Sequence, residues 1–524
     1  MNDWKPSHNP WAVALTVTLA TFMEVLDSSI ANVALPHIAG NLSASESEAT
    51  WVLTSYLVSN AIILPISAWL ATRFGRKRFY MSCVAVFGIS SFLCGLAPTL
   101  GALVFFRILQ GCGGGGLAPS EQAILADTFP PSKRGIAFAV YGMAVVVAPA
   151  IGPVLGGWIT DNYNWHWIFY INVPVALLSL FLTNRLVEDP PYLKREQERS
   201  RKFRVDFVGL GLIALAIGSL QMVLDKGQEA DWFASRWITA CLAVAITALV
   251  SWIVWELRHP DPIVDLKLFK KRNFAMAMFF TFILGFVLYG TTVIIPQFLQ
   301  TLLGYPAVKA GEALAGGGVA MLLMMPVAGI LVSRVDPRGM MAFGFAVTSA
   351  ALYYMVTHVS LQMDFVTASL LRTLQASGLA FIFLPSNTLA YVGMAREQNN
   401  QVSSMNAFIR NIGGSIGIAL ISTFLTRQSQ VHQNYLVSNA TPGNPLFDQM
   451  LAGITAGLRQ AGISAGDATL QAYGRINAMI QAQAVTLAYI DVVSVMAVVV
   501  MCLVPLVTLM RRGKPGEGAA EPMH

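Results

Sequence analysis

Repeated apolar runs, each roughly 18 to 25 residues long, limit what this chain can fold into. A helix that rises about 1.5 Å per residue needs about 20 apolar residues to cross a hydrocarbon core about 30 Å thick, whereas barrel strands are short and alternating. The composition agrees, because only 12% of the residues are charged and 55% are hydrophobic, against about 25% charged residues in soluble domains. The sequence therefore predicts an all-α integral membrane protein.

We expect fourteen transmembrane helices, with boundaries uncertain by a few residues. They are placed near residues 12–36, 50–71, 79–97, 101–122, 136–160, 166–187, 207–225, 236–257, 274–300, 311–333, 340–357, 364–393, 403–426 and 485–510. The first run is too long, and too rich in acids, for a cleaved signal peptide.

The distribution of lysine and arginine predicts the orientation. With the N-terminus inside, cytoplasmic segments hold 25 of these residues, exterior segments hold six, and the remaining three lie within spans. Positive charge concentrates on the cytoplasmic side of membrane proteins. We therefore expect a multi-pass protein of the cytoplasmic (inner) membrane with both termini inside. The net charge of +6 is a by-product of this topology, and no nucleic-acid partner is expected.

The spans divide into six, two and six. We expect an N-terminal six-helix bundle over residues 1–187, a basic linker with two extra transmembrane helices over 188–273, and a C-terminal bundle over 274–524 with an exterior loop at 427–484. Helical spacing is nevertheless visible within that loop, in LFDQMLAGITAGLRQ. The two bundles look like copies, because FFRILQG at 105–111 aligns with LLRTLQA at 370–376. Repeats of this kind build the central site of many transporters, although apolar helices can also align by chance.

Two acids stand inside the first span. Glu24 and Asp27 share a helical face with small residues, Ala20, Ala31 and Ala34. A charge at bilayer depth costs about 2.5 to 3.5 kcal/mol or more, so an intramembrane carboxylate is a functional candidate. We interpret both acids as proton-coupling residues. The alternative is a permanent buried ion pair with a structural role only.

Three arginines also lie within predicted spans. Arg107 shares a helical face with Gln110, Gly114 and Glu121, and Arg410 shares one with Asn406. We expect Arg107 to tune the proton affinity of Asp27, since a guanidinium that approaches or leaves a carboxylate changes that affinity. Arg107 could instead be a static partner that joins two helices. The candidate substrate cavity comprises Gln110, Glu121, Asn406 and Arg410, and Arg372 reflects the repeat.

Other kinds of site are not expected. The glycine-rich stretches GCGGGG at 111–116 and APAIGPVLGG at 148–157 have no GKS or GKT after them, so neither is a phosphate loop, and we interpret them as sites of close helix contact. The five cysteines have no metal-ligand spacing, and no catalytic constellation is present. We expect no metal, no cofactor and no enzymatic activity, with the proton-motive force as the energy source.

The motifs together resemble those of the major facilitator superfamily, in its fourteen-span drug:proton antiporter branch and most closely in the EmrB-type efflux pumps. LDSSIANVALP at 26–36 looks like the first-span signature, which places the acidic position at Asp27. Arg107, Gln110 and Gly111 match the fourth-span motif. The fifth-span antiporter motif, which in the family marks exporters, is matched by Ala148, Gly152, Pro153, Gly156 and Gly157.

The motif of the cytoplasmic gate is kept only in part. LATRFGRKR resembles it through Leu70, Arg73, Gly75, Arg76 and Lys77. The usual aspartate, which in the family joins a charge network that latches the cytoplasmic side, is Thr72, and the leading glycine is Ala68. The resemblance therefore leaves the latch in doubt.

The resemblance implies two six-helix bundles related by a pseudo-twofold axis, with the two extra spans inserted between them. It implies proton-coupled export of lipophilic small molecules or drugs by alternating access. It also implies a periplasmic adaptor and an outer-membrane channel as partners, with the segment 427–484 as the docking region. The open alternatives are a proton-coupled uptake symporter and a membrane receptor or enzyme that transports nothing.

Overall fold

The structure is a computed structural model that describes residues 6–510 apart from 203–204 and 261. Within these residues the regular elements are α-helices and short 3-10 turns, without strands. Residues 1–5 and 511–524, which the predicted domains include, lie outside the described part of the chain, as do Lys5, Arg204, Arg511, Arg512 and Lys514 of the orientation argument.

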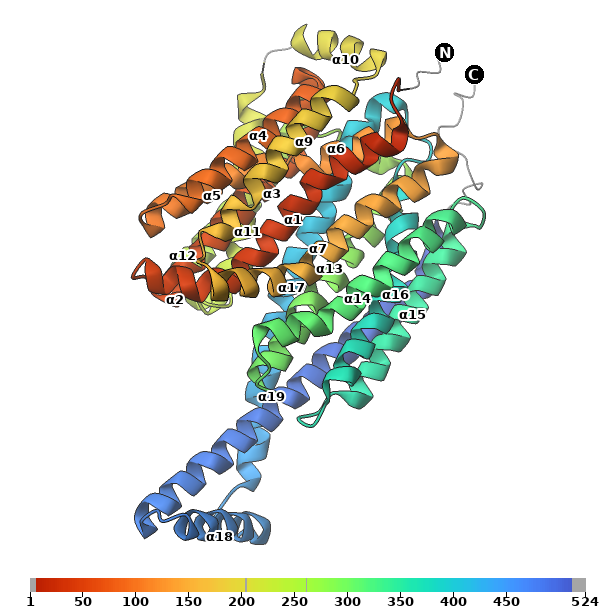
Figure 1. The fold of residues 1–524 in the computed structure, drawn as a ribbon. Helices are drawn as coiled ribbons and strands as arrows, with labels where there is room; N and C mark the ends of the chain where they lie inside the picture. Colours follow the sequence, from red (N-terminus) through yellow and green to blue (C-terminus); the bar gives the residue numbers. More distant parts are fainter. Residues whose placement is uncertain (1–5, 203–204, 261, 511–524) are drawn as a thin grey trace.

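The N-terminal half forms one bundle (Figure 1). Its helices are α1 (Pro10–Asn41), α2 (Glu46–Ala49), α3 (Trp51–Phe74), α4 (Arg76–Gly95), α5 (Leu100–Gly114), α6 (Leu117–Thr128), α7 (Arg134–Asn162), α8 (Trp167–Tyr170) and α9 (Asn172–Leu186). The predicted fourth span is interrupted, since α5 ends at Gly114 and α6 starts at Leu117. The glycine run there supplies little side-chain packing and weakens the helix.

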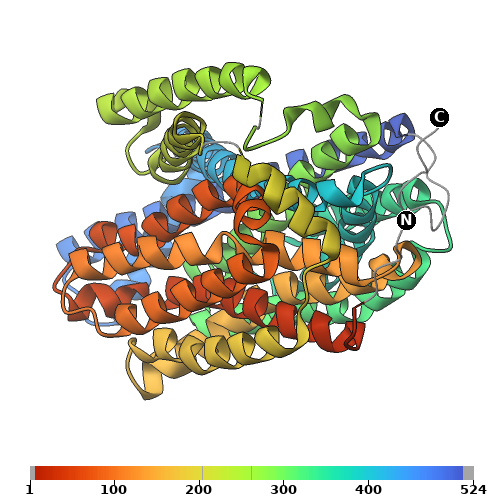
Figure 2. The ribbon, with the colours of Figure 1, turned by 90° about the horizontal axis from the view of Figure 1, so that it is seen from above.

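A linker with two long helices separates the halves in sequence. Its helices are α10 (Pro191–Lys202), α11 (Phe207–Lys226) and α12 (Arg236–Arg258). The polar helix α10 lies at the end of the molecule where the two termini are drawn (Figure 1). Helices α11 and α12 pair with each other at the edge of the molecule, where α11 packs on α3 and contacts α17 (Asn399–Asn439) (Figure 2).

The C-terminal half forms the second bundle. Besides α17, its helices are α13 (Arg272–Thr301), α14 (Ala307–Leu331), α15 (Pro337–His358), α16 (Phe365–Ala390), α18 (Pro445–Gln460) and α19 (Ala465–Leu506). In the described part of the chain, thirteen helices are long and apolar enough to cross a membrane. A fourteenth is α7, whose segments 131–149 and 151–162 meet at 42°. Prolines at 149 and 153 explain the bend, because each removes a backbone hydrogen bond.

The segment 427–484 is largely helical, where a loop was expected. Helix α17 continues to Asn439 and α19 already begins at Ala465, so the two project beyond the bundles as a hairpin (Figure 1). The helical spacing predicted over LFDQMLAGITAGLRQ corresponds to α18, which packs on α19 through Leu458, Ala468 and Ala472. At about 1.5 Å per residue, the 42 residues of α19 are about 60 Å long, roughly twice the hydrocarbon core.

The two halves meet most extensively where α7 packs along α14. Glycines permit this approach at both ends: a Cβ added at Gly135 would lie 2.3 Å from Val332, and one added at Gly157 would lie 3.1 Å from Val308. Helix α3 packs against α17 in a second contact between the halves. Residues of these four helices therefore line the boundary between the halves.

Candidate functional site

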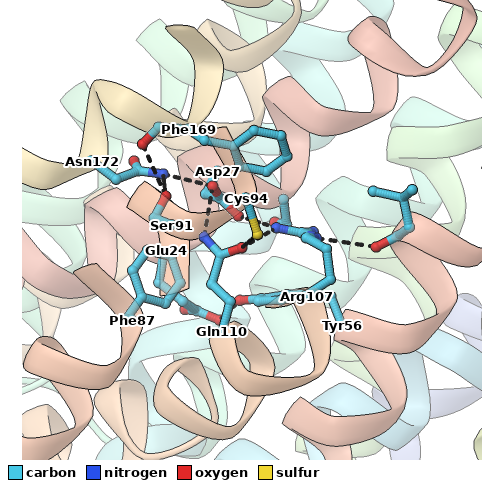
Figure 3. A network of polar contacts seen from close by, with 12 residues as sticks. Glu24, Asp27, Tyr56, Phe87, Ser91, Cys94, Arg107, Gln110, Phe169 and Asn172 are labelled. Carbon is cyan, nitrogen blue, oxygen red and sulfur yellow. Dashed lines mark hydrogen bonds and ion pairs between the residues drawn. The ribbon is translucent and has the colours of Figure 1, made fainter. Parts of the chain in front are cut away.

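Asp27 and Arg107 form a buried ion pair within the N-terminal half (Figure 3). The Nη1 atom of Arg107 donates to Asp27 Oδ2 at 2.6 Å, and the two side chains are 0% and 1% exposed. Arg107 also donates to the Gln110 Oε1 atom at 2.7 Å and to the carbonyl oxygen of Val52 at 3.0 Å. A guanidinium at this depth is thus held by groups from α1, α3 and α5.

Two amides complete the shell of the Asp27 carboxylate. Gln110 Nε2 donates to Asp27 Oδ1 at 3.0 Å, and Asn172 Nδ2 of α9 donates to the same oxygen at 2.6 Å. Asn172 is in turn 3.0 Å from the Ser91 hydroxyl of α4 (Figure 3). Both oxygens of the Asp27 carboxylate are therefore hydrogen-bonded in this conformation.

Glu24 lies one turn before Asp27 and has a different environment. Its Oε1 atom accepts hydrogen bonds from the Tyr56 hydroxyl at 2.9 Å and from Asn60 Nδ2 at 3.1 Å, both on α3. No described cation forms an ion pair with it, and its side chain is only partly buried. The ring of Tyr56 meanwhile lies 4.3 Å from the guanidinium of Arg107. Tyr56 therefore joins the two acidic positions.

Glycines bring α5 close enough to form this cluster. A Cβ added at Gly111 would lie 2.0 Å from the Ser59 hydroxyl and 2.5 Å from the carbonyl oxygen of Tyr56. One added at Gly114 would lie 2.8 Å from the Tyr56 hydroxyl and 3.3 Å from Glu24 Cγ. The glycine-rich stretch is thus a helix-contact surface, as expected from its sequence.

Glu121 of α6 is completely buried. Its Oε1 atom accepts a hydrogen bond from Thr18 of α1 at 2.5 Å, while Oε2 has no hydrogen-bond partner among the described residues. The structure thus places Glu121 beside α1, away from the Arg107 network.

Asn406 and Arg410 of α17 reach across the boundary between the halves. Asn406 Nδ2 donates to Gln122 of α6 at 2.8 Å, and Arg410 Nη2 donates to the hydroxyl of Tyr141 on α7. Gln122 also donates to Tyr141, at 2.9 Å. All these side chains are buried. This interdomain network must break when the two halves separate.

The fifth-span motif lies where α7 contacts α1 and α14. A Cβ added at Gly152 would lie 2.3 Å from the Ser29 hydroxyl, and one added at Gly156 would lie 3.1 Å from Ile30. Ala148 is fully buried, and Pro153 lies beside Gly311 of α14. The motif therefore makes α7 narrow enough to sit between the two halves.

The gate motif occupies the α3–α4 junction. Gly75 has φ +91°, a conformation that favours glycine, and it allows α4 to start immediately after α3. Arg76, 1% exposed, pairs with Asp127 of α6 at 2.5 Å. Its Nε atom donates to Asn400 of α17 at 2.8 Å. A buried charge network therefore links the two halves at the end that carries the termini.

Of the remaining gate residues, Arg73 binds the linker and Lys77 binds the end of α9. Arg73 Nη1 donates to the carbonyl oxygen of Ser200 at 2.7 Å, and Lys77 Nζ donates to that of Asn184 at 2.8 Å. Thr72, which stands where the family has aspartate, accepts a hydrogen bond from Asn400 at 3.2 Å. A threonine thus receives one interdomain bond at this position, whereas a carboxylate could accept several.

Several residues of these networks were missed from sequence. They are polar side chains within apolar spans or next to the basic linker: Tyr56, Asn172, Tyr141, Asp127, Asn399, Asn400 and Tyr192. A single Asn or Tyr hardly changes the mean hydropathy of a span, so the sequence does not distinguish a residue of a polar network from one that only packs. Asp127 could have been found, because it is an acid shortly after a span that already holds Glu121.

Among the described residues no group of three or more His, Cys, Asp or Glu could hold a metal ion.

Comparisons with known proteins agree with this architecture. The sequence model of the Major Facilitator Superfamily matches residues 17–418. The chain is 39% identical to the multidrug export protein EmrB of Escherichia coli over 447 residues, which cover 85% of this chain and 86% of EmrB. It is also 39% identical to the fatty acid resistance protein FarB of Neisseria gonorrhoeae over 498 residues, 95% of each chain.

A solved structure shares the fold at low identity. The proton:xylose symporter XylE superposes with a TM-score of 0.62 over 97% of each chain, at 14% sequence identity. At that identity the likeness concerns the fold alone.

Proposed function

Because the chain belongs to the major facilitator superfamily and its relatives include the EmrB multidrug export proteins, we propose that it exports lipophilic small molecules in exchange for protons. Export proceeds by alternating access, in which the two six-helix halves rock about the bound substrate. The chain is a multi-pass membrane protein of a transporter family, and this family is not a class of enzymes.

The Asp27–Arg107 ion pair, with Glu24 one turn away, is the observation that carries the proton coupling. In this conformation Asp27 accepts hydrogen bonds from three donors, which occupy both of its oxygens. A rearrangement that moves α5 from α1 would leave the carboxylate buried without its cation and favour protonation. Glu24 is less buried and can pass the proton between Asp27 and water. Tyr56, which touches both sites, couples their states.

The energetics suit this cycle. One proton that moves inward through about 100 mV releases about 2.3 kcal/mol. Since a tenfold ratio costs about 1.4 kcal/mol, one proton sustains roughly a fiftyfold gradient of a neutral substrate. The proton-motive force is therefore a sufficient energy source for drug efflux, and no cofactor is needed.

The orientation follows from charge. The end with α10 and the gate network is basic, so it faces the cytoplasm, and the α17–α19 hairpin projects on the exterior side. The Arg76–Asp127 pair and its bonds to α17 then close the cytoplasmic end in this conformation. Opening toward the cytoplasm requires these bonds to break.

The hairpin offers a docking region for a periplasmic adaptor that leads to an outer-membrane channel. Large apolar side chains are exposed along it, including Leu446 at 76%, Leu470 at 73% and Tyr435 at 70%. Tyr435 and Leu470 lie on α17 and α19, which are much longer than a membrane about 30 Å thick requires, and Leu446 lies on α18, which connects them. Lipid cannot cover such residues, and a helical adaptor can.

Substrate-driven proton flux in proteoliposomes tests the function. With the chain in vesicles that carry a pH gradient, a lipophilic drug such as ethidium should dissipate the gradient by antiport. A symporter would instead carry substrate and protons in the same direction. Absence of any flux with several lipophilic compounds would refute transport and leave the receptor hypothesis.

A further inference from the structure

Arg372 in the C-terminal half repeats the bonds of Arg107 without the carboxylate. Its Nη1 atom donates to Gln375 Oε1 at 2.8 Å, as Arg107 does to Gln110. The same Nη1 atom and Gln375 Nε2 both donate to the Thr291 hydroxyl, at 2.9 Å and 2.8 Å. Thr291 thus takes the place that Asp27 has in the other half.

The guanidinium of Arg372 is consequently a buried cation without a counterion. The residue is 5% exposed, and no described carboxylate lies within ion-pair distance. Nη2 donates to the Thr292 hydroxyl at 2.9 Å, while Nε has no hydrogen-bond partner among the residues that the structure describes. Arginine stays protonated in proteins, and an uncompensated buried charge costs several kcal/mol. An anion that pairs with Arg372 would remove this cost.

A cavity lies directly against this cation, at the boundary of the halves. Its volume is about 20 Å³, room for about one water molecule. The residues with polar groups in its lining are Arg372, Thr292 and Tyr289. Its apolar lining comes from both halves: Val145, Val146 and Pro149 of α7, Leu288 of α13 and Leu314 of α14.

The cavity lies between helices of the two halves, so it widens if the halves move apart. Gly317 and Gly318 place the backbone of α14 beside Arg372, since a Cβ added at Gly317 would lie 2.9 Å from Arg372 Cγ. Because α7 and α14 belong to different halves, rocking of the halves separates the walls of the cavity. The cation then faces a wider space that is apolar on the opposite side.

We propose that Arg372, with Thr292 beside it, binds the carboxylate of a lipophilic organic acid whose hydrocarbon part lies against the apolar wall of α7 and α14. A guanidinium binds a carboxylate through paired, charge-assisted hydrogen bonds. The apolar wall favours an amphiphile over a bare inorganic anion. The inference deepens the proposed function by naming a substrate class, and its transport part rests on that function.

Equilibrium binding tests the site without transport. Radiolabelled decanoate is bound to the purified full chain in nanodiscs, and unlabelled decanoate, decanol or sodium chloride is added as competitor. Decanoate should displace the label, whereas decanol, which has the same chain without the charge, should not. Arg372→Gln should weaken decanoate binding about tenfold or more, the loss expected for a charge-assisted pair.

Two further variants keep the result interpretable. Thr291→Asp supplies an internal counterion in the position of Asp27, so it should abolish decanoate binding while it preserves the fold. Arg236→Gln, which removes an exposed arginine of α12, should bind like the parent. Equal affinity in Arg372→Gln and the parent, or displacement by decanol, would overturn the proposal. Full displacement by chloride at physiological concentration would also overturn it, since a small anion would then be the occupant.

Proton flux separates this site from the general function. In proteoliposomes, Arg372→Gln should lose the flux driven by decanoate and keep the flux driven by ethidium. If the parent binds decanoate but no compound drives proton flux, the proposed antiport fails and the anion site stands. If ethidium drives proton flux and Arg372→Gln binds decanoate with the affinity of the parent, the proposed antiport is supported and the anion site is refuted.

Discussion

Arg107 and Arg372 stand 265 residues apart at matching positions of the two halves, yet only Arg107 has a carboxylate partner. Each donates to a glutamine three residues later, at 2.7 Å and 2.8 Å. The two halves thus keep the same arginine–glutamine scaffold and differ in charge. We interpret the paired arginine as part of the proton machinery and the unpaired one as part of substrate binding.

Removal of Asp27 should separate coupling from stability. In Asp27→Asn, Arg107 becomes a buried cation without a partner, so the free energy of unfolding should fall by about 3–5 kcal/mol, measured by thermal unfolding in detergent. In the double variant Asp27→Asn/Arg107→Gln much of this loss should be regained, because neither charge remains. Neither variant should show drug-driven proton flux. Normal coupling in the stable double variant would remove Asp27 from the mechanism.

Glu24→Gln should affect transport far more than stability. The amide oxygen of glutamine can accept the bonds from Tyr56 and Asn60 that Glu24 accepts now. We expect unfolding to change by less than about 1 kcal/mol and proton flux at a given drug concentration to fall at least about tenfold, the factor typical for loss of a proton-transfer group. Tyr56→Phe is the matched variant, since it keeps the ring over Arg107. Unaltered flux in Glu24→Gln would exclude Glu24 as a proton carrier.

The glycines of α5 provide a matched pair of variants. Gly111→Ala places a methyl group 2.0 Å from the Ser59 hydroxyl and 2.5 Å from a backbone oxygen of α3, so it should destabilise the protein by about 1–3 kcal/mol. Gly101→Ala, in the same helix, meets no atom within 4 Å and should stabilise it by about 0.5–1 kcal/mol. Thermal unfolding of the two variants compares them directly. Equal effects would mean that α3 and α5 are not in close contact.

Asp127→Asn should loosen the end that carries the gate network. Arg76 would lose its carboxylate, and Asn399 and Tyr192, which also donate to Asp127, would bind an amide instead. Spin labels at the exposed positions 78 and 396, on opposite halves, should then show a larger population of long distances. Thr72→Asp is the converse variant, because a carboxylate offers Asn400 more acceptor sites than the hydroxyl of Thr72 does, and it should favour the short distances. An unchanged distribution in both would mean that the network does not hold this end closed.

Sequence patterns identified the membrane class, the helices and the Arg107 and Asp27 positions, because intramembrane charges are rare and stand out. They did not identify the contacts that give those charges different surroundings. Asp27 and Glu24 lie on one predicted face, but the amides of Asn172 and Asn60 that distinguish them come from other helices. The sequence did not predict that α17 and α19 continue far beyond the spans expected at 403–426 and 485–510, because the Gln- and Ala-rich segment between them lacks the apolar content that marks a span, although the periodicity of α18 is visible.

Leu458 offers a test of whether the hairpin serves docking or transport. It is 4% exposed and joins α18 to Ala468 and Ala472 of α19. Leu458→Asp buries a charge in this small cluster, so α18 should detach and become sensitive to protease, whereas the membrane core keeps its stability. Drug-driven proton flux in proteoliposomes, where no adaptor is present, should match that of the parent. Drug resistance in cells that contain an adaptor and channel should fall, because docking is then lost.

The exposed Leu470→Asp, which leaves the cluster intact but alters the outer surface, should reduce resistance without protease sensitivity. Loss of flux in the vesicles would instead assign the hairpin to the transport cycle.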